Sequence, residues 1–359
     1  MTKPVYIIAE AGVNHDGSVD DALRLIDAAA EAGADCIKFQ VFSAEALTSV
    51  DAQKADYQKR ASGSDESQRE MLKRLELPTS AFALLMAHAK KRQIDFLSTP
   101  FDPASLVFLI NELGLTQIKV GSGDLTNAPM LLDIAKAGRN VILSTGMATL
   151  EEVKEALSVL VFGYARRAEP PSCDAFAAAW ADTAARSQLH GKVELLHCTT
   201  EYPAPGNSVN LRAMDTLAEA FGLPVGYSDH TLGIEVAVAA VARGAVTIEK
   251  HLTLDRSRFG PDHAASLDPN DFRAMVRAIR LVEGALGDGR KVPQPAEIKN
   301  IPIARKALVA ARPIAAGEAF SWENIAVKRP ACGLPPSQLW SVLGKVAPRS
   351  YRSDEPIEP

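Results

Sequence analysis

Residues 5–40 read VYIIAEAGVNHDGSVDDALRLIDAAAEAGADCIKFQ. The runs at 5–10 and 35–40 are short and rich in Val, Ile and Phe, which is typical of buried strands. Between them, residues 19–34 are amphipathic and rich in Ala and Leu, as in a helix that packs on one face. A strand, a helix and a second strand in this order predict a βαβ unit and a parallel sheet.

The same strand–helix unit recurs along the chain, with eight apolar runs before residue 290. They are VYIIAE (5–10), DCIKFQ (35–40), IDFLST (94–99), QIKVGS (117–122), NVILST (140–145), VELLHC (193–198), PVGYSD (224–229) and AVTIEKH (245–251). Eight such units close a (β/α)₈ barrel, so we predict an α/β chain with a TIM barrel. A doubly wound sheet is the alternative, but no G-x-G-x-x-G follows any of the runs.

The predicted domains are a catalytic barrel over residues 1–287, a linker over 288–300 and a small, mostly β module over 301–359. The linker is rich in Gly, Pro and charge, and the module consists of short apolar runs broken by Pro and Gly. Two of the barrel units are overlong. We expect residues 43–75 to form a long βα loop over the barrel mouth, and 163–192 to serve packing or an oligomer contact.

The composition excludes several classes of protein. A formal net charge of −5 argues against a nucleic-acid scaffold, and no apolar run approaches the roughly eighteen residues of a membrane span. No secretory signal is visible at the N-terminus. The cysteines at positions 36, 173, 198 and 332 form no CxxC pair, so we expect reduced thiols in a cytoplasmic protein.

Polar residues stand at the end of every predicted strand. They are Glu10; Lys38 and Gln40; Thr99; Lys119, Ser122 and Asp124; Ser144; His197, Thr200 and Tyr202; Ser228, Asp229 and His230; and Glu249 and His251. A single polar strand end can simply meet solvent. In a TIM barrel, however, these ends converge on the active-site mouth, so eight of them together predict a binding site.

The two lysines of this set indicate the kind of ligand. A buried lysine is costly unless it is paired with an anion. Structural pairs such as Lys38 with Glu10 would satisfy this need. A small, multiply charged anion would also satisfy it, and the hydroxyls at 99, 122, 144 and 228 offer the donors that a phosphate and a carboxylate require.

Five of the seven histidines are candidates for a site, as one pair and three single residues. His230 and His251 end neighbouring strands, which lie about 5 Å apart, and two imidazoles completed by water and substrate suit a divalent ion such as Mn²⁺. His15, His197 and His263 stand alone, and we expect each to be a hydrogen-bonded loop or core residue.

Nine motifs, in order along the chain, resemble those of the sialic acid synthase family, including its legionaminic acid synthase branch. They are IAEAGVNHDG (8–17), KFQ (38–40), STPFD (98–102), KVGSGD (119–124), LSTGM (143–147), HCTTEYPAP (197–205), GYSDHT (226–231), EKH (249–251) and GPDH (260–263). The C-terminal stretches ARKALVAARPIAAGE and VKRP resemble the antifreeze-like (SAF) domain of the same enzymes.

This resemblance implies a metal-dependent transferase that condenses phosphoenolpyruvate with an N-acetylmannosamine-type sugar to give a nine-carbon 2-keto acid and phosphate. Residue by residue it implies phosphoenolpyruvate binding by Lys38, Thr99, Lys119, Ser122, Ser144, Thr200 and Ser228; metal binding by His230 and His251; catalytic roles for Glu10, Lys38, Asp124 and Tyr202; and sugar binding by Gln40, Asp124, Tyr202, Asp262 and Arg329. Because the family's cap-domain arginine reaches a neighbouring subunit's barrel, Arg329 implies a swapped homodimer.

Two departures from the family pattern leave the acceptor sugar open. Asp124 stands where enzymes of the N-acetylmannosamine type usually have Glu, and Thr200 where several have Asn. Both variants resemble the legionaminic acid synthase branch, whose acceptor is a 2,4-diacetamido-trideoxymannose.

Two other functions remain as alternatives at this point. One is another phosphoenolpyruvate aldol synthase, which makes a seven- or eight-carbon 3-deoxy sugar acid phosphate and should lack the SAF module. The other is a catalytically dead sugar-binding barrel. A TIM-barrel metallohydrolase is disfavoured because no HxH follows an early strand.

Overall fold

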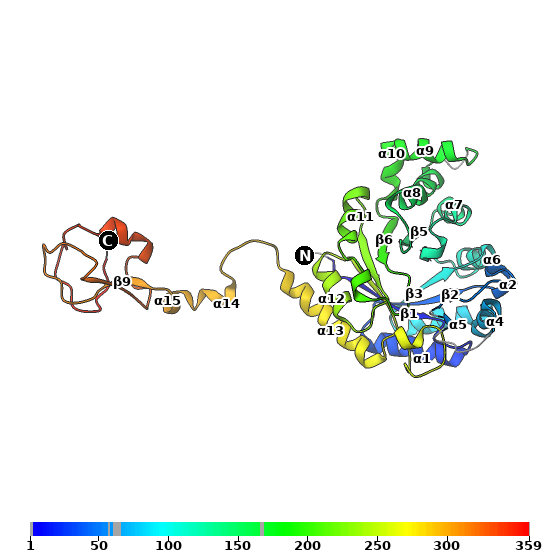
Figure 1. Cartoon of the computed structure of the whole chain (residues 1–359), viewed down its shortest axis with the longest axis horizontal. Coiled ribbons are helices and arrows are strands. Elements are labelled where there is room, and N and C mark those ends of the chain that lie inside the picture. The colour runs from blue at the N-terminus through cyan, green and yellow to red at the C-terminus, as the bar shows by residue number, and fades with distance from the viewer. Residues whose placement is uncertain (1–2, 57, 60–65, 166–168, 359) are drawn as a thin grey trace. The chain divides into compact units, whose positions relative to one another are not determined.

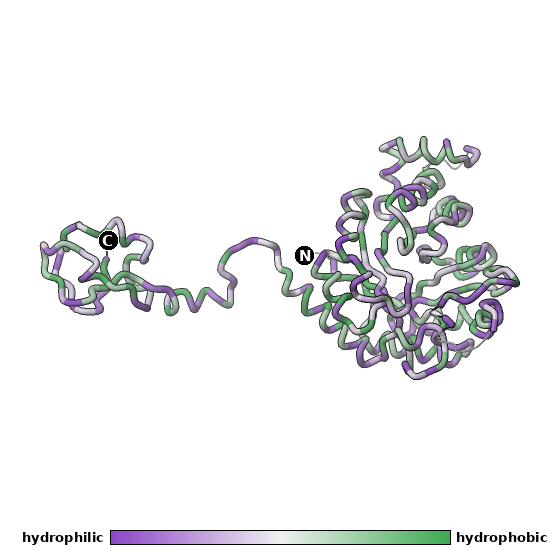
Figure 2. The backbone as a smooth tube through the Cα atoms, in the orientation of Figure 1, coloured by the Kyte–Doolittle hydropathy of each residue, from purple (hydrophilic) through white to green (hydrophobic). Residues whose placement is uncertain are grey.

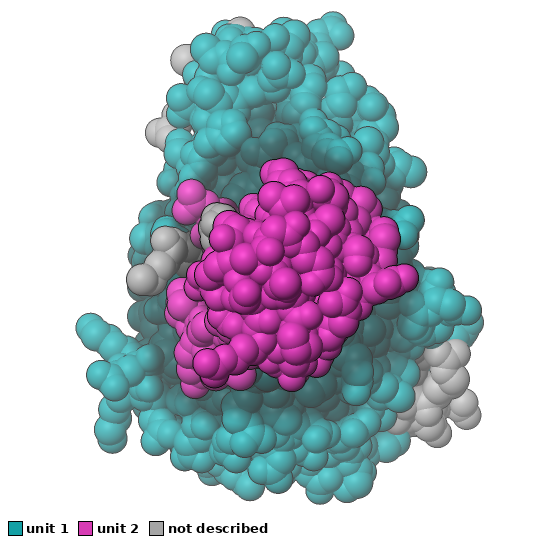
Figure 3. Space-filling view, turned by 90° about the vertical axis from the view of Figure 1, so that its left-hand side faces the viewer, with its two compact units in different colours: residues 1–287 teal, residues 288–359 magenta. Residues whose placement is uncertain are grey.

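The structure, a computed structural model, describes residues 3–56, 58–59, 66–165 and 169–358 (Figure 1). The chain forms two compact units, Met1–Gly287 and Asp288–Pro359, coloured separately in Figure 3. The predicted linker at 288–300 falls within the second unit and contains the short helix α14 (Pro295–Ile298).

The first unit is built on eight parallel strands in the order β3-β2-β1-β8-β7-β6-β5-β4. They are β1 (Tyr6–Gly12), β2 (Cys36–Val41), β3 (Asp95–Pro100), β4 (Gln117–Val120), β5 (Asn140–Ser144), β6 (Val193–Cys198), β7 (Val225–Asp229) and β8 (Thr247–His251). The end strands β3 and β4 lie side by side, so the sheet is a nearly closed barrel. The predicted TIM barrel is confirmed.

Helices surround the strands (Figure 1). The main ones are α1 (Val19–Ala32), α5 (Thr79–Lys91), α6 (Pro103–Val107), α7 (Ala128–Lys136), α8 (Leu150–Ala165), α11 (Ala213–Phe221), α12 (Glu235–Ala242) and α13 (Pro269–Leu286). Ser18 caps α1 by accepting from the Asp21 N–H, and Gly33 ends it in the left-handed conformation, at φ 87°. Both hydrophobic and hydrophilic residues occur along these helices (Figure 2), and their buried apolar residues form the main core with the strands.

The interior of the barrel changes character along its axis. A small apolar cluster fills one level of it, made of Ile8, Cys36, Leu97, Ile142 and Leu196. Side chains on one face of a strand recur every second residue. The next inward residues toward the carboxyl ends of β1, β2, β3 and β5 are therefore Glu10, Lys38, Thr99 and Ser144.

The overlong segment 43–75 contains α2 (Ala44–Leu47) and α4 (Gln68–Leu75); residues 57 and 60–65 lie outside the described part. Met71 and Leu75 of α4 pack with Val13 and Phe42 in an apolar cluster. Side chains from both helices line the cavity at the barrel mouth, as the sequence predicted for this segment.

The second insertion, 163–192, contains α9 (Cys173–Ala181), α10 (Thr183–Arg186) and the short turn η3 (Ser187–Leu189), while residues 166–168 lie outside the described part. Helix α9 packs against α8, and the Phe162 and Phe176 rings meet with centroids 5.2 Å apart. The packing role is confirmed. The oligomer contact stays a prediction.

The second unit has a small core of its own around Leu308, Phe320 and Tyr351. Strand β9 (Ala307–Ala310) pairs antiparallel with β10 (Ile325–Lys328). Short helices α15 (Ile301–Ala304) and α16 (Leu339–Val342) and isolated bridges such as Ile314 with Tyr351 complete the unit. Across the described part of the chain, no helix is both long and apolar enough to cross a membrane.

Candidate functional site

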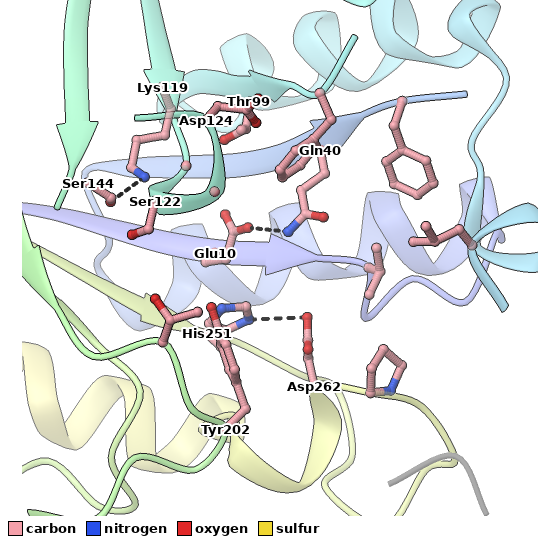
Figure 4. Close-up of a pocket in the computed structure, with 18 of the residues that line it drawn as sticks. Glu10, Gln40, Thr99, Lys119, Ser122, Asp124, Ser144, Tyr202, His251 and Asp262 are labelled. Atoms are coloured by element: carbon pink, nitrogen blue, oxygen red, sulfur yellow. Dashed lines mark hydrogen bonds and ion pairs between the residues drawn. The ribbon is translucent and has the colours of Figure 1, made fainter. Parts of the chain in front are cut away.

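A cavity of about 540 Å³ opens at the carboxyl ends of the barrel strands. Every site residue that the sequence predicted in the first unit lines it; ten of them are labelled in Figure 4. These residues are Glu10, Lys38, Gln40, Thr99, Lys119, Ser122, Asp124, Ser144, Thr200, Tyr202, Ser228, His230, His251 and Asp262. The remaining one, Arg329, is exposed and follows β10 in the second unit.

Two buried lysines and two buried glutamates form the charged floor of the cavity. Lys38 Nζ lies 2.7 Å from Glu10 Oε2 and 3.5 Å from Glu249 Oε2. Lys119 Nζ lies 3.7 Å from Glu249 Oε1. The structural pair that the sequence allowed, Lys38 with Glu10, is thus present, and Glu249 bridges the two lysines.

These contacts set the charge of each group. Burial raises the pKa of Glu10 above its usual value, although Lys38 opposes this effect. Burial also acts to raise the pKa of Glu249, but Lys119 and Lys38 outweigh it and hold that pKa at about 2. Burial lowers the pKa of Lys119, whereas for Lys38 the two carboxylates overcome burial and raise it. Glu249 is therefore a fixed anion, while Glu10 is the carboxyl group nearer to accepting a proton.

Hydroxyl groups surround the lysines. Lys119 donates to Ser144 Oγ over 2.7 Å (Figure 4). Lys38 donates to Thr99 Oγ1 over 3.3 Å. Ser228 Oγ donates to Glu249 Oε1 over 2.8 Å. Thr200 Oγ1 is buried but makes no hydrogen bond to any described residue. Such an unsatisfied buried hydroxyl fits a site that is completed by a polar ligand.

The two predicted metal ligands face each other, with ring centroids 5.6 Å apart. His230 Nδ1 donates to the Thr199 carbonyl over 2.7 Å, which leaves Nε2 without a proton in the neutral ring. His251 Nδ1 is buried, lies 3.7 Å from Asp262 Oδ2 and has no hydrogen bond to a described residue. Burial lowers the pKa of both imidazoles, which favours the neutral form that binds metals.

The donor set at these histidines fits a divalent cation only in part. The residues described here contain no cluster of three or more His, Cys, Asp or Glu side chains that could hold a metal. Two neutral imidazoles and the unsatisfied nitrogen of His251 nevertheless fit a cation whose other ligands are water and substrate.

Aromatic and polar residues shape the rest of the cavity. The Tyr202 ring packs on His230, with centroids 4.2 Å apart. Gln40 donates to Glu10 Oε1 over 3.1 Å, and Asn127 donates to Asp124 Oδ1 over 2.9 Å. Burial raises the pKa of Asp124.

Glycine at position 12 allows the end of β1 to pass close to the His251 ring. Its φ is 54°, and a Cβ at this position would lie 3.3 Å from that ring.

The three single histidines lie outside the cavity lining. His197 donates from Nε2 to the Val209 carbonyl over 2.7 Å. His263 bonds Thr253 Oγ1 and Asp16, and His15 accepts from the Gly17 N–H. The prediction of hydrogen-bonded loop or core residues is confirmed.

With this geometry in place, comparison with known proteins identifies the family. The NeuB family profile matches residues 25–291, and the SAF domain profile matches residues 305–359. The chain belongs to the NeuB family. The predicted family and its C-terminal SAF domain are confirmed.

Individual NeuB relatives are similar over nearly the whole chain. The N,N'-diacetyllegionaminic acid synthase of Campylobacter jejuni is 49% identical and covers 99% of both chains. The enzyme of the same name from Legionella pneumophila is 42% identical over 94% of this chain and 89% of its own. The crystal structure of N-acetylneuraminic acid (sialic acid) synthetase from Leptospira borgpetersenii has a TM-score of 0.67 and 34% identity, and covers 83% of this chain and 90% of that one. The chain is accordingly an enzyme.

One residue of this NeuB site was not assigned a role from the sequence. Glu249 was noted only as a polar strand end, yet it contacts both lysines and Ser228. Its two-residue spacing from His251 places both side chains on the inner face of β8, so the sequence could have placed Glu249 in the site but could not show its partners.

Proposed function

We propose that this enzyme is a phosphoenolpyruvate-dependent nonulosonic acid synthase, which joins phosphoenolpyruvate to an amino-sugar aldehyde and releases phosphate. The observation that carries the proposal is the convergence of Lys38 and Lys119, both buried, with four hydroxyl side chains in a single cavity at the mouth of a NeuB barrel. A small molecule bearing a phosphate and a carboxylate matches this arrangement of donors.

The residues have distinct tasks in this reaction. Lys38 with Thr99 and Lys119 with Ser144 bind the two anionic ends, which fixes the enol carbon C3 against the aldehyde. C3 forms the new bond to the aldehyde carbon, water adds to C2, and the C2–O bond to phosphate breaks as C2 becomes a ketone. Glu10 has a raised pKa and lies beside Lys38, which suits a group that passes a proton at the reacting carbons.

Mass spectrometry of the products from phosphoenolpyruvate plus a panel of hexosamines tests the reaction. We expect a nine-carbon 2-keto acid and one equivalent of phosphate, with Lys119→Met as the blank. A seven- or eight-carbon product would indicate another phosphoenolpyruvate aldol synthase. Absence of phosphate release with every sugar would leave only a catalytically dead sugar-binding barrel.

The proposal includes a divalent cation, with Mn²⁺ preferred to Mg²⁺ or Co²⁺, held by His230 and His251. When bound there, it would act as a Lewis acid toward the aldehyde oxygen. Support comes from the two neutral imidazoles and the unsatisfied His251 nitrogen. Chelation should abolish turnover and Mn²⁺ should restore it, except in His230→Ala. A control is His197→Asn, which alters a partly buried histidine outside the cavity and should still be rescued. Full activity after metal removal would disprove the metal site.

We propose N,N'-diacetyllegionaminic acid as the product, formed from the 2,4-diacetamido sugar. The two relatives bearing that name and the shorter carboxylate of Asp124 support this choice. Asp is one C–C bond, about 1.5 Å, shorter than Glu, which leaves room for a 4-acetamido group. A site built around one polar contact discriminates against sugars that leave it unpaired.

The acceptor is tested by comparing kcat/KM for the diacetamido sugar and N-acetylmannosamine. Wild type should prefer the former, and Asp124→Glu should shift the preference toward the latter. If Asp124 instead reaches the same hydroxyl through a water, wild type will prefer N-acetylmannosamine.

We further propose a homodimer in which Arg329 of one chain serves the barrel of the other. Arg329 is exposed on a unit that has its own core, so it is free to contact a partner. Arg329→Ala and His251→Ala should each be inactive as pure homodimers. After subunit exchange, random pairing should recover about a quarter of wild-type activity. No recovery would favour an arginine that acts within its own chain.

The cytoplasm is the proposed location. All four cysteines, each in the described part of the chain, are free thiols, and Cys173 and Cys332 are exposed. Exposed free thiols suit a reducing compartment.

A further inference from the structure

A second buried ion pair lies behind the two histidines, outside the cavity. Lys250 Nζ donates to Asp229 Oδ2 over 2.8 Å, and both side chains are 0% exposed. The two residues are strand partners at the carboxyl ends of β7 and β8. Asp229 immediately precedes His230, and Lys250 immediately precedes His251. Because side chains alternate along a strand, the pair lies on the outer face of the barrel wall while the histidines lie on the inner face.

Both members of the pair also hold the backbone just beyond His230. Asp229 Oδ1 accepts from the Thr231 N–H over 2.9 Å and from Thr231 Oγ1 over 2.8 Å. Lys250 Nζ donates to the Thr231 carbonyl over 2.5 Å. His230 therefore lies between Asp229 and Thr231, both of which are held by hydrogen bonds. Lys250, which donates to both of them, comes from β8.

Further hydrogen bonds hold the histidines themselves. The His230 carbonyl accepts from the Ala204 N–H over 2.8 Å, and its ring donates to Thr199. The His251 carbonyl accepts from the Leu267 N–H over 2.9 Å. The Asp229–Lys250 pair joins the two strand ends on the outer face of the wall, as the Ser228–Glu249 hydrogen bond joins them on the inner face.

A fully buried ion pair adds little to the stability of the fold. Apolar residues of similar volume usually stabilise a core as well or better, because burying two charges costs much of what their attraction returns. What the pair adds to the strand pairing is a directional contact between the two strand ends, which an apolar contact does not provide.

We propose that Asp229 and Lys250 are positioning residues, which hold the imidazoles of His230 and His251 at the separation needed to bind one divalent cation. This inference rests on the proposed function, which places the cation at these histidines. Neither residue touches the cavity; each acts through the histidine that follows it.

The test uses the full chain stripped of metal and the double variant Asp229→Asn with Lys250→Met. Both charges are removed. Asn has the same length as Asp and its Oδ1 can still accept from Thr231, and Met is unbranched and one heavy atom shorter than Lys. Mn²⁺ binding is measured by the electron paramagnetic resonance signal of the free ion. We expect the Kd to rise about 10–100-fold, as for other residues that support metal ligands. The melting temperature should not fall, and saturating Mn²⁺ should restore most of kcat with little change in KM for phosphoenolpyruvate.

The control is a partly exposed carboxylate–cation pair at the opposite end of the barrel. Arg280 donates to Asp35 Oδ2 over 2.7 Å, just before β2 begins. Asp35→Asn with Arg280→Met should leave the Mn²⁺ Kd unchanged. An equal rise in both double variants would show general loosening and would overturn the inference.

The other outcomes are also distinct. Wild-type affinity in the folded Asp229→Asn, Lys250→Met protein overturns the positioning role. If that protein does not fold, Asp229→Asn alone takes its place, and an unchanged Kd there overturns the role as well. If wild type binds Mn²⁺ no better than the His251→Ala variant, both the metal site and this inference are disproved. The proposed function fails separately, when wild type makes no condensation product.

Discussion

The barrel interior has an apolar level and a charged level, which are built from the same strands but have different roles. At one level, Ile8, Cys36, Leu97, Ile142 and Leu196 pack together without a charged group among them. One step further toward the carboxyl ends, Glu10, Lys38 and Glu249 place charges in an equally buried setting. Apolar contacts gain free energy from burial, whereas buried charges must be compensated by one another. We infer that the apolar level mainly stabilises the barrel and that the charged level mainly binds the ligand.

The sharpest test of this division is Lys119→Met at the charged level. The variant loses the ammonium that contacts Ser144 and Glu249, so we expect kcat/KM for phosphoenolpyruvate to fall about 10²–10³-fold. Glu249 keeps Lys38 and Ser228 as partners, which limits the loss of stability. Steady-state kinetics and thermal unfolding check the two effects. A variant that unfolds but keeps its specific activity would contradict the division.

The converse test is Leu97→Ala at the apolar level. Leu97 is 3% exposed, and truncation of a buried leucine costs about 2–5 kcal/mol because it leaves a cavity. Denaturant unfolding should show this loss, while kcat/KM of the folded protein should change less than about tenfold. A loss of activity as large as that of Lys119→Met, with intact stability, would mean that the levels are not separate.

A smaller effect, on the pH dependence of the free energy of unfolding, is expected for His197 on the outer face of the barrel wall. Burial lowers its pKa below the usual value near 6.5, so the folded state binds a proton less readily than the unfolded chain. The stability contribution of His197 is present above that usual value and is lost as pH falls through it toward the lowered folded pKa. His197→Asn should therefore reduce the loss of unfolding free energy between pH 7 and pH 5, measured by denaturant titration at each pH. If the free energy of unfolding of the variant depends on pH as steeply as that of wild type, the lowered pKa of His197 is contradicted.

Much of the site follows from local sequence. The residues at the strand ends could be named because a strand exposes alternate side chains and because parallel strands of a barrel end at one mouth. This reasoning found Lys38, Lys119, His230 and His251, all of which line the cavity. It did not find the role of Glu249, because nothing in a single strand shows which lysines it will meet.

The sequence alone determined the eight-unit barrel and the polar residues at its strand ends, because strand and helix periods and the polarity of strand ends are local properties of the chain. Its resemblance to a known family identified the SAF module. Only the tertiary structure decided the pairings. Glu249 meets Lys38 and Lys119, and Asp229 meets Lys250, because of the register between strands that are distant in sequence or joined by a helix. It also decided that α9 would pack on α8, through a Phe162–Phe176 contact that neither segment specifies alone. Such contacts depend on how elements are brought together, and the free energy of that assembly comes from the whole core rather than from any one segment.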